Sequence, residues 1–399
     1  MLRDQHTIHS IVYEAQDRVG GKSLTFERGD FLCEMGTCYA TRGDRIARRW
    51  MKQLGFECEA LGVSKLDGEA FMTYVNGGKG LPLPLQLSHY LLRRKRLLKR
   101  IEKDPEDREA ASEAAMPILE WLRRYRLYKI ERLQHRAMTV MGYGFLEETS
   151  TLQALRWVDW DLILSGAVQD LVTPVHGWSR FWESLALDLN VRQSSRVLAV
   201  RRDSEQVTID TAEGSESFEH VVCAMALDDF CRLTQPTPNE RFVNGGVRWG
   251  RYCTSLVAAD WFTKEQTRGY SASVTSPAKA GRMLAARHEG HAAELGGDLY
   301  VCGQIMGNYS SQELIEVLTA DIEADSGRNV HVVLQKTWKY FPQYKLSAIE
   351  NGLLAVMNKM QGENRTWYTG ATFSHEAVSK IAQFNARLAL RIAQSAKPV

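Results

Sequence analysis

The sequence IVYEAQDRVGGKS, residues 11–23, decides the fold class of this chain. Its first residues form a short β-prone run, Ile11–Tyr13, and Glu14 stands directly after that run. An acid at the end of such a strand binds the ribose hydroxyls of a dinucleotide in a Rossmann-type unit. Glycines let the backbone approach a pyrophosphate closely, and cations balance its charge. The stretch therefore predicts a dinucleotide site formed by Glu14, Arg18, Gly20, Gly21 and Lys22.

The first half of a dinucleotide-binding unit does not fit before this stretch. Such a unit has a strand followed by GxGxxG roughly 20 residues before the acid, and only thirteen residues precede Glu14. We therefore expect either a chain truncated at its amino terminus or a weakened cofactor site. Residues 1–7, MLRDQHT, are expected to end a helix that leads to the strand at 11–13.

Four segments in the same order along the chain resemble the flavin-containing amine oxidase superfamily. They are RVGGKS (18–23) with CEMG (33–36), MGYGFLE (141–147), TWKYFP (337–342) and KMQGENRTWYTG (359–370). Within the superfamily, the chain looks like the flavin-dependent polyunsaturated fatty acid isomerases and their relatives. The resemblance implies an α/β fold: an FAD-binding Rossmann-like domain, lacking its first strand and glycine-rich turn, with an inserted α+β substrate domain. Without that turn, we expect the chain to bind FAD poorly.

The resemblance also implies where the flavin lies. Glu34 and Gly36 match the E-x-G motif of the family and are expected near the flavin, although Glu34 could equally be a surface strand residue. Val197 matches the position whose backbone contacts the adenine, and any strand core residue could be valine. The turn at Gly370 and the helix that follows, with Val378 in its first turn, are expected to present free N–H groups to the flavin pyrimidine edge.

The alternation of segments predicts two domains. Residues 1–60, 170–226 and 355–399 are expected to form the FAD-binding domain, and residues 61–169 and 227–354 the substrate domain. Apolar residues at helical spacing predict a helix over 44–55 that stops at Gly55. Residues 86–135 are expected to be helical, and the run from 116 to 133 continues the pattern as a further helix.

Residues 86–101 combine an apolar face with a strongly cationic one. This pattern is typical of the solvated face of an amphipathic helix, and it also fits peripheral contact with a membrane surface. The sequence KDPEDREAASE that follows restores negative charge and favours the first interpretation.

The flavin itself explains why the sequence indicates no catalytic acid or base. A flavin transfers hydride through its own ring, so the protein needs only to position the substrate and tune the cofactor. If 338–341 is a strand, Trp338 and Tyr340 share one face and Phe341 points away. Trp338 and Tyr340 are therefore expected to bind the substrate, with Tyr340 facing the flavin, and the catalytic residues stay unknown.

Composition excludes several other classes of protein. A formal net charge of +2 over 399 residues gives no global argument for nucleic acid binding. No stretch approaches the roughly 20 apolar residues of a membrane span, and no apolar signal core follows the early charges, so we expect a cytoplasmic protein. The seven cysteines are never spaced as CxxC, which argues against a zinc site or a disulfide framework.

Three functions stay open at this point. The leading hypothesis is an FAD-dependent oxidoreductase that removes a hydride from a lipophilic small molecule. The second is a redox-neutral, FAD-dependent double-bond isomerase of the same fold. The third is an inactive, truncated flavoprotein fragment.

Overall fold

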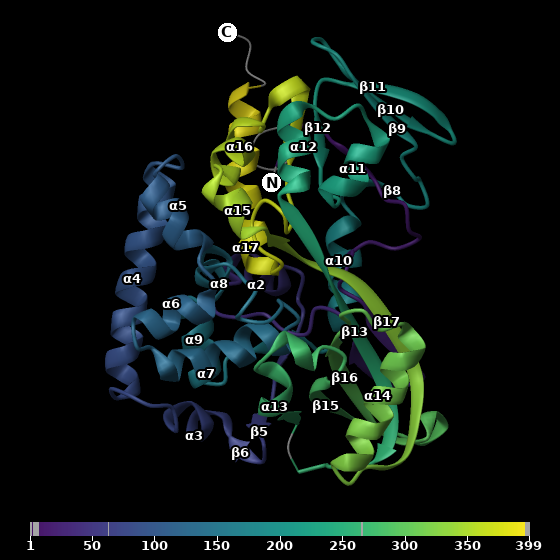
Figure 1. Cartoon of the computed structure of the whole chain (residues 1–399). Coiled ribbons are helices and arrows are strands. Elements are labelled where there is room, and N and C mark those ends of the chain that lie inside the picture. Colours follow the sequence, from purple (N-terminus) through teal and green to yellow (C-terminus); the bar gives the residue numbers. More distant parts are fainter. Residues whose placement is uncertain (1, 3–7, 63, 265, 396–399) are drawn as a thin grey trace.

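The computed structural model describes residues 2, 8–62, 64–264 and 266–395. Figure 1 shows a mixture of helices and strands in three parts: an upper part that contains the chain ends, a lower sheet with long strands, and a group of helices beside it. This mixed architecture confirms the α/β fold class. The expected helix end at residues 1–7 lies almost entirely outside the described residues.

The upper part is built from strands that pair across the sequence. Its strands are β1 (Ile11–Tyr13), β8 (Asn190–Arg192), β9 (Ala199–Arg202), β10 (Val207–Thr211), β11 (Gly214–Phe218), β12 (Val221–Cys223) and β18 (Thr366–Tyr368). Strand β1 pairs in parallel with β8, and β12 pairs in parallel with β18. Strands β9, β10 and β11 form an antiparallel sheet, with the β10–β11 hairpin turn just before Gly214. Segments far apart in the sequence therefore meet here.

Helices surround these strands (Figure 1). They are α10 (Gly177–Ala186), α11 (Leu227–Leu233), α12 (Pro238–Gly245), α15 (Leu346–Glu350), α16 (Leu353–Lys359) and α17 (Val378–Ser395), with a short 3-10 turn, η4 (Glu363–Arg365). Helix α12 begins with a capping box, because the Thr237 hydroxyl accepts from the Glu240 N–H while the Glu240 carboxylate accepts from the Thr237 N–H. Glu240 is thereby fixed at the start of the helix.

A loop-rich segment leads from β1 into the interior. It holds β2 (Thr25–Arg28), β3 (Phe31–Glu34), α2 (Arg45–Gln53) and β4 (Cys58–Ala60), and β4 pairs with β7 (Val172–Pro174). Helix α2 confirms the helix predicted over 44–55, and Gly55 closes it with a φ of 74°. The β2–β3 hairpin ends at Glu34 and Met35, so it delivers the CEMG segment to the centre of the molecule.

A seven-stranded sheet forms the lower part of Figure 1 in the order β17-β13-β16-β15-β14-β5-β6. Its strands are β5 (Ser64–Leu66), β6 (Glu69–Ala70), β13 (Val247–Asp260), β14 (Thr267–Gly269), β15 (Met283–Ala292), β16 (Gly297–Ile305) and β17 (Arg328–Tyr344). Helix α14 (Ser311–Ala324) packs on the sheet (Figure 1). The short helices α13 (Ser271–Val274) and η2 (Pro277–Lys279) lie between β14 and β15 in the sequence, and η3 (Ala293–Leu295) lies between β15 and β16. The two longest strands, β13 and β17, run from this sheet to the upper part (Figure 1).

Strand β17 carries an irregularity close to the upper part. Its register with β13 shifts between Trp249 and Gly250, and Phe341 has a φ of 51°. Neighbouring side chains in a regular strand point to opposite faces. Here the bulge instead brings the rings of both Tyr340 and Phe341 against Tyr143, at 5.7 Å and 5.0 Å between ring centroids.

The third part is a group of helices at the lower left of Figure 1. They are α3 (Phe71–Asn76), α4 (Leu83–Lys103), α5 (Arg108–Ala115), α6 (Ile118–Arg124), α7 (Tyr128–Gln134), the π-helix η1 (His135–Val140), α8 (Thr151–Trp157) and α9 (Trp160–Ala167). The continuous helix expected over 116–133 is wrong. Arg126 has a φ of 55°, so the chain breaks between α6 and α7 and the Leu127 N–H donates to the Leu122 carbonyl at 2.9 Å.

Helix α4 confirms the amphipathic pattern at 86–101. Tyr90, Leu97 and Ile101 are buried. Several of the cations on α4 bind within the protein, since Arg94 donates to the Leu155 carbonyl at 2.6 Å and Arg100 pairs with Asp107 at 3.0 Å. Contact of this helix with a membrane surface stays a prediction. In the described part of the chain, every helix is too short or too polar to cross a membrane.

Candidate functional site

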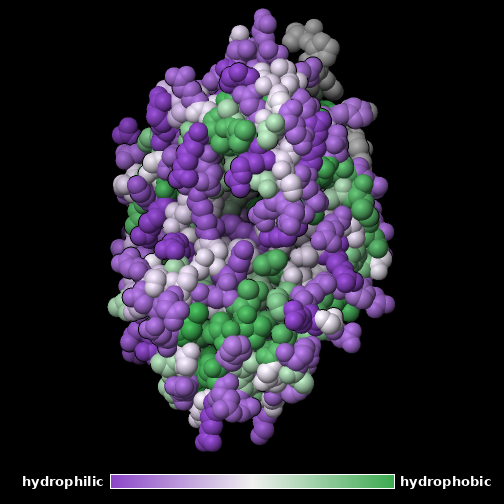
Figure 2. Space-filling model, turned by 90° about the vertical axis from the view of Figure 1, so that its right-hand side faces the viewer, coloured by the Kyte–Doolittle hydropathy of each residue, from purple (hydrophilic) through white to green (hydrophobic). Residues whose placement is uncertain are grey.

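A cavity of 1560 Å³ lies where the three parts of the molecule meet. It exceeds the roughly 300–1,000 Å³ of an ordinary ligand pocket, so it has room for more than one small molecule. Figure 2 shows the molecule hollowed near the middle of one face, between hydrophilic side chains. The predicted site residues that line the cavity are Gly20, Gly21, Lys22, Glu34, Gly36, Trp338, Tyr340, Gly370 and Val378.

The glycine pair after β1 forms one edge of the cavity. Gly20 and Gly21 have φ values of 94° and 57°, a left-handed backbone that glycine adopts without strain. The Arg18 guanidinium donates to the carbonyls of Gly21 at 2.6 Å and Ser23 at 2.9 Å. Arg18 therefore holds the turn in shape from outside the cavity, and its expected contact with a pyrophosphate stays a prediction.

Gly36 lies at the closest backbone approach in the site. A Cβ atom at this position would lie 1.8 Å from the Lys22 carbonyl oxygen. The loop around Gly36 is tied to the glycine turn by the Ser23 hydroxyl, which donates to Thr37 at 2.9 Å. Only glycine fits here, which explains why the E-x-G signal could be read from the sequence.

Glu34 is a buried carboxyl group at the end of β3, with 6% of its surface exposed. Its Oε1 atom accepts from the Thr25 hydroxyl at 2.9 Å and the Trp178 backbone N–H at 2.8 Å, whereas Oε2 has no partner among the described residues. Burial raises the pKa of Glu34 to about 7, against hydrogen bonds that lower it. The interpretation of Glu34 as a surface residue is therefore wrong.

This raised pKa predicts how stability depends on pH. Between pH 4.5 and about 7, the folded chain keeps a proton on Glu34 that the unfolded chain has released. The free energy of unfolding should therefore fall as the pH rises through this window, by a contribution on the order of 3 kcal/mol. Glu34→Gln should remove that contribution. Urea denaturation of both proteins across the window measures it, and a difference between them that is independent of pH would contradict the assignment.

The second glycine turn and the start of α17 form the opposite edge. Gly370 has a φ of 88°, and Val378, the first residue of α17, lines the cavity. The amino end of this helix therefore lies at the cavity wall, where a helix presents unpaired N–H groups and a partial positive charge. The helix begins two residues later than the expected start near 376.

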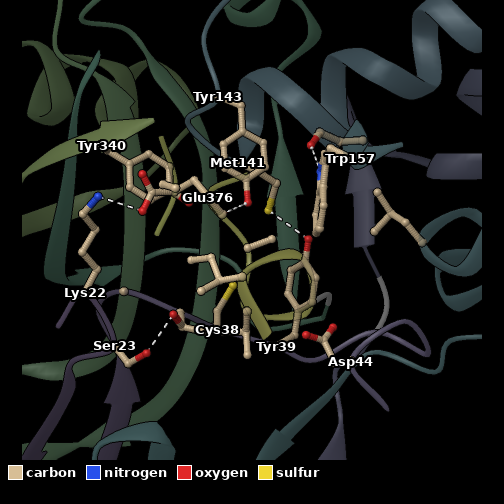
Figure 3. Close-up of a pocket in the computed structure, with 18 of the residues that line it drawn as sticks. Lys22, Ser23, Cys38, Tyr39, Asp44, Met141, Tyr143, Trp157, Tyr340 and Glu376 are labelled. Carbon is tan, nitrogen blue, oxygen red and sulfur yellow. Dashed lines mark hydrogen bonds and ion pairs between the residues drawn. The ribbon is translucent and has the colours of Figure 1, made fainter. Parts of the chain in front are cut away.

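Glu376, just before α17, links three segments of the site (Figure 3). Its Oε1 atom pairs with the Lys22 ammonium at 2.7 Å, and its Oε2 atom accepts from the Phe341 N–H at 2.9 Å. The Tyr143 hydroxyl donates to the Glu376 carbonyl at 2.7 Å. The carboxylate thus holds the bulge of β17 and joins it to the glycine turn.

Aromatic rings form the wall beyond Glu376. The rings of Tyr340 and Tyr143 stack with an angle of 9° between their planes. The centroid of the Tyr252 ring lies 5.8 Å from that of the Tyr340 ring. The Lys22 ammonium lies 5.0 Å from the Trp249 ring and 5.4 Å from the Tyr340 ring, in the range of cation–π contacts. Burial raises the pKa of Tyr340 and of Tyr143 well above the usual value, so both phenols are neutral.

Trp338 and Tyr340 both line the cavity, whereas Phe341 does not. The Trp338 indole N–H donates to the Thr254 hydroxyl at 2.9 Å, which fixes its ring. Trp157 lies across the cavity from Tyr340 (Figure 3). The rings therefore enclose a mainly apolar space with few polar groups.

Besides Arg18, two further expected cofactor residues, Glu14 and Val197, do not line the cavity. Glu14 accepts a hydrogen bond from the Gln16 N–H at 2.8 Å, and its own N–H donates to the Arg192 carbonyl, so it caps the loop after β1. Val197 packs against the main hydrophobic core. The ribose role of Glu14 and the adenine contact of Val197 stay predictions.

Sequence reasoning missed several residues of the cavity wall. They are Tyr39, Arg136, Met141, Tyr143, Trp157 and Glu376. The segment MGYGFLE did carry a signal, because Gly142 and Gly144 flank Tyr143 with φ values of 80° and 86°. No local pattern marks Arg136 or Glu376.

A comparison with known protein families identifies the family to which this chain belongs. The family of flavin containing amine oxidoreductases matches residues 2–245, and the chain belongs to this family. A flavin is the cofactor that this membership implies. No curated protein matches the chain by sequence.

Solved structures share the fold across nearly the whole chain. The fatty acid isomerase from P. acnes that produces CLA superposes with a TM-score of 0.79 and 17% identity, over 96% of this chain and 92% of that one. Putrescine oxidase bound to putrescine gives 0.67 and 13%, over 96% and 92%. Cyclohexylamine oxidase from Brevibacterium oxydans IH-35A gives 0.66 and 15%, over 96% and 93%.

Proposed function

We propose that the protein is an FAD-dependent oxidoreductase that removes a hydride from a lipophilic small molecule. One observation carries the proposal: a single cavity joins two glycine turns, which leave backbone free for a cofactor, to a wall of aromatic and apolar side chains. A dinucleotide needs close backbone approach, and an apolar substrate needs such a wall.

The residues present fit a flavin. The glycine turns leave open space at Gly21, where a Cβ atom would meet no described atom within 4 Å, and at Gly370, where its nearest neighbour would be the Ala224 carbonyl at 3.7 Å. The amino end of α17 lies at the cavity wall. We propose that FAD lies along this edge, beside Glu34 and Gly36. When bound, the flavin supplies the hydride acceptor.

The roles of the remaining residues follow from their positions. Trp338 and Tyr340 orient the substrate against the cofactor edge, and Lys22 with Glu376 fixes the Tyr340 ring. The side chains around the aromatic wall exclude water from the reacting carbon. The two-domain division, the cytoplasmic location and the membrane contact of α4 stay predictions.

An absorbance spectrum of the purified protein tests the proposal. Bands of an oxidised flavin, before or after incubation with FAD, are expected, and a protein that stays colourless would contradict the function. Oxygen consumption or reduction of an artificial acceptor with a lipophilic substrate indicates net oxidation. Formation of a conjugated diene without either would instead indicate the redox-neutral isomerase.

Tyr340→Ala should impair turnover more than it impairs flavin binding, because the Tyr340 ring forms the aromatic wall and contributes no backbone to the glycine turns. Loss of substrate positioning should lower turnover by roughly 10- to 100-fold. Flavin content by absorbance and turnover on the same sample measure the two effects. Tyr309→Ala removes a partly exposed tyrosine outside the cavity and serves as the control. Unchanged turnover in Tyr340→Ala would reject the role.

A further inference from the structure

Helix α4 presents an exposed side that carries both leucines and cations. Leu85, Leu92, Arg96 and Lys99 follow one another at intervals of seven, four and three residues, so they lie on one side of the helix. The opposite side of α4 is buried in the helical part of the molecule. Figure 1 shows α4 at the outer edge of that part, with α3 near its lower end and α5 near its upper end.

The lower end of α4 is apolar and open to solvent. Leu81, Leu85 and Leu92 are 61%, 55% and 54% exposed, and Met72 of α3 is 40% exposed. Single exposed leucines are common on protein surfaces, whereas a group of large apolar side chains marks an interaction surface. These four residues form the apolar half of what we call the α4 face.

Three exposed cations, Lys95, Arg96 and Lys99, form the other half of the α4 face. Arg94 and Arg100 bind within the protein, as described above. By contrast, none of the three exposed side chains makes a hydrogen bond or an ion pair with another described residue. Their charge is therefore available to a partner outside the chain.

The acidic segment that follows α4 leaves this positive charge in place. Glu102 is the single acidic residue within α4. Asp107 and Glu109 pair with Arg100 at 3.0 Å and 2.8 Å, so their charge is balanced inside the protein. The end of the helix also lies about 28 Å from Leu85, because each residue of an α-helix adds 1.5 Å. The apolar half of the face is thus far from the acidic segment.

The α4 face adjoins the cavity. Met72 and Pro84 are exposed at the surface and also line the cavity, together with Phe71, Leu83 and Leu87. The exposed apolar surface is therefore continuous with the apolar wall of the cavity.

We propose that the α4 face docks on an anionic membrane surface, with its leucines and Met72 in the apolar layer and its cations at the lipid head groups. Amphipathic helices with leucines and cations bind membranes in this way, and long cationic side chains extend to the head groups while their stems lie along apolar surface. A bilayer matches both halves of the face at once, whereas an acidic protein would match only the cations.

Docking at this face would place the nearby part of the cavity wall against the bilayer. A lipophilic molecule dissolved in the membrane could then enter the cavity along Met72 and Pro84 without crossing water. This delivery of substrate rests on the proposed function, whereas the docking itself does not.

Sedimentation of the purified chain with lipid vesicles tests the proposal. Vesicles of phosphatidylcholine alone are compared with vesicles that contain about one third phosphatidylglycerol. Each cation near an anionic surface contributes roughly fivefold in affinity, so the three cations should favour the anionic vesicles on the order of 100-fold. Added salt should weaken this preference, because it screens the charges.

A first variant removes the charge of the face. The triple change Lys95→Gln, Arg96→Gln and Lys99→Gln should abolish the preference for anionic vesicles. The matched control removes three exposed cations from other elements: Arg328→Gln, Lys345→Gln and Lys359→Gln. This control should keep the preference, although its net charge is the same.

A second variant removes apolar side chains and keeps the charge. Leu85→Ser with Leu92→Ser should weaken binding to the anionic vesicles by roughly 10- to 100-fold, because less apolar area enters the bilayer. Leu187→Ser with Leu198→Ser is the matched control, since these leucines are 83% and 55% exposed in the upper part of the molecule. This control should bind as the unaltered chain does. Thermal unfolding of each variant reports whether the fold is intact.

Several results would overturn the inference. They are equal binding of the unaltered chain to the two kinds of vesicle, and a preference that survives the triple change. A dimer that the change at Leu85 and Leu92 dissociates, in a protein that binds no vesicle, would also overturn it, because a second copy would then cover the face. Vesicle binding needs no flavin. A colourless protein that binds anionic vesicles would therefore reject the proposed function and support the docking.

Discussion

Glu240→Ala is expected to lower the free energy of unfolding by about 3–5 kcal/mol, because it leaves a buried arginine without its counter-charge. The side chains of Arg202 and Glu240 are 4% and 0% exposed, with Nη1 and Oε1 at 2.7 Å and Nη2 and Oε2 at 3.0 Å. Glu240 also accepts from the Tyr368 hydroxyl, and Arg202 donates to the Gln235 carbonyl. The pair therefore joins β9, α12 and β18.

The direction of the Glu240 pKa agrees with this expectation. Burial raises the pKa, but the hydrogen bonds from Arg202 and Tyr368 outweigh it and hold the pKa of Glu240 below its usual value.

Urea denaturation measures the loss of unfolding free energy in Glu240→Ala. Glu148→Ala breaks the pair with Arg248, whose side chains are 40% and 56% exposed, and should cost no more than about 1 kcal/mol. Equal losses in the two variants would contradict the argument.

Gly36→Ala should weaken flavin binding relative to the unaltered protein and lower stability by about 1–3 kcal/mol. The added methyl group would lie 1.8 Å from the Lys22 carbonyl oxygen, and this neighbour is backbone, which no side-chain rotation can move. The glycine turn and the β3 loop must separate to admit it, so the proposed cofactor edge loses its shape. Flavin content by absorbance and the thermal midpoint measure the two effects.

Gly245→Ala provides the control for this substitution. Gly245 lies in α12, and a Cβ there would meet no atom within 4 Å. Alanine favours a helix over glycine, so this variant should be neutral or more stable by up to about 1 kcal/mol. A Gly36→Ala protein with a normal flavin content would show that the approach of the two loops is not needed for cofactor binding.

Local signals in the sequence predicted the glycine turns well. Gly20, Gly36 and Gly370 have roles set by their own backbone or by one close neighbour, and such roles leave a recognisable motif. Period-two spacing likewise placed Trp338 and Tyr340 on the cavity side of a strand. The fold class followed from the same motifs.

Long-range contacts could not be predicted in this way. Glu376 binds Lys22 across 354 positions of sequence, and no pattern near either residue indicates the other. The break at Arg126 was missed because the apolar spacing continues through α6 and α7, although the backbone turns between them.

The two bonds of the Glu376 carboxylate join the two edges of the site. One carboxylate oxygen pairs with Lys22 on the glycine-turn loop, and the other accepts a hydrogen bond from the Phe341 N–H on the aromatic wall. A movement of either edge therefore changes the contacts that hold the other edge. Such coupling is reciprocal by thermodynamic necessity. A ligand that changes the aromatic wall should therefore change the affinity for the flavin, and the flavin should change the affinity for that ligand by the same factor.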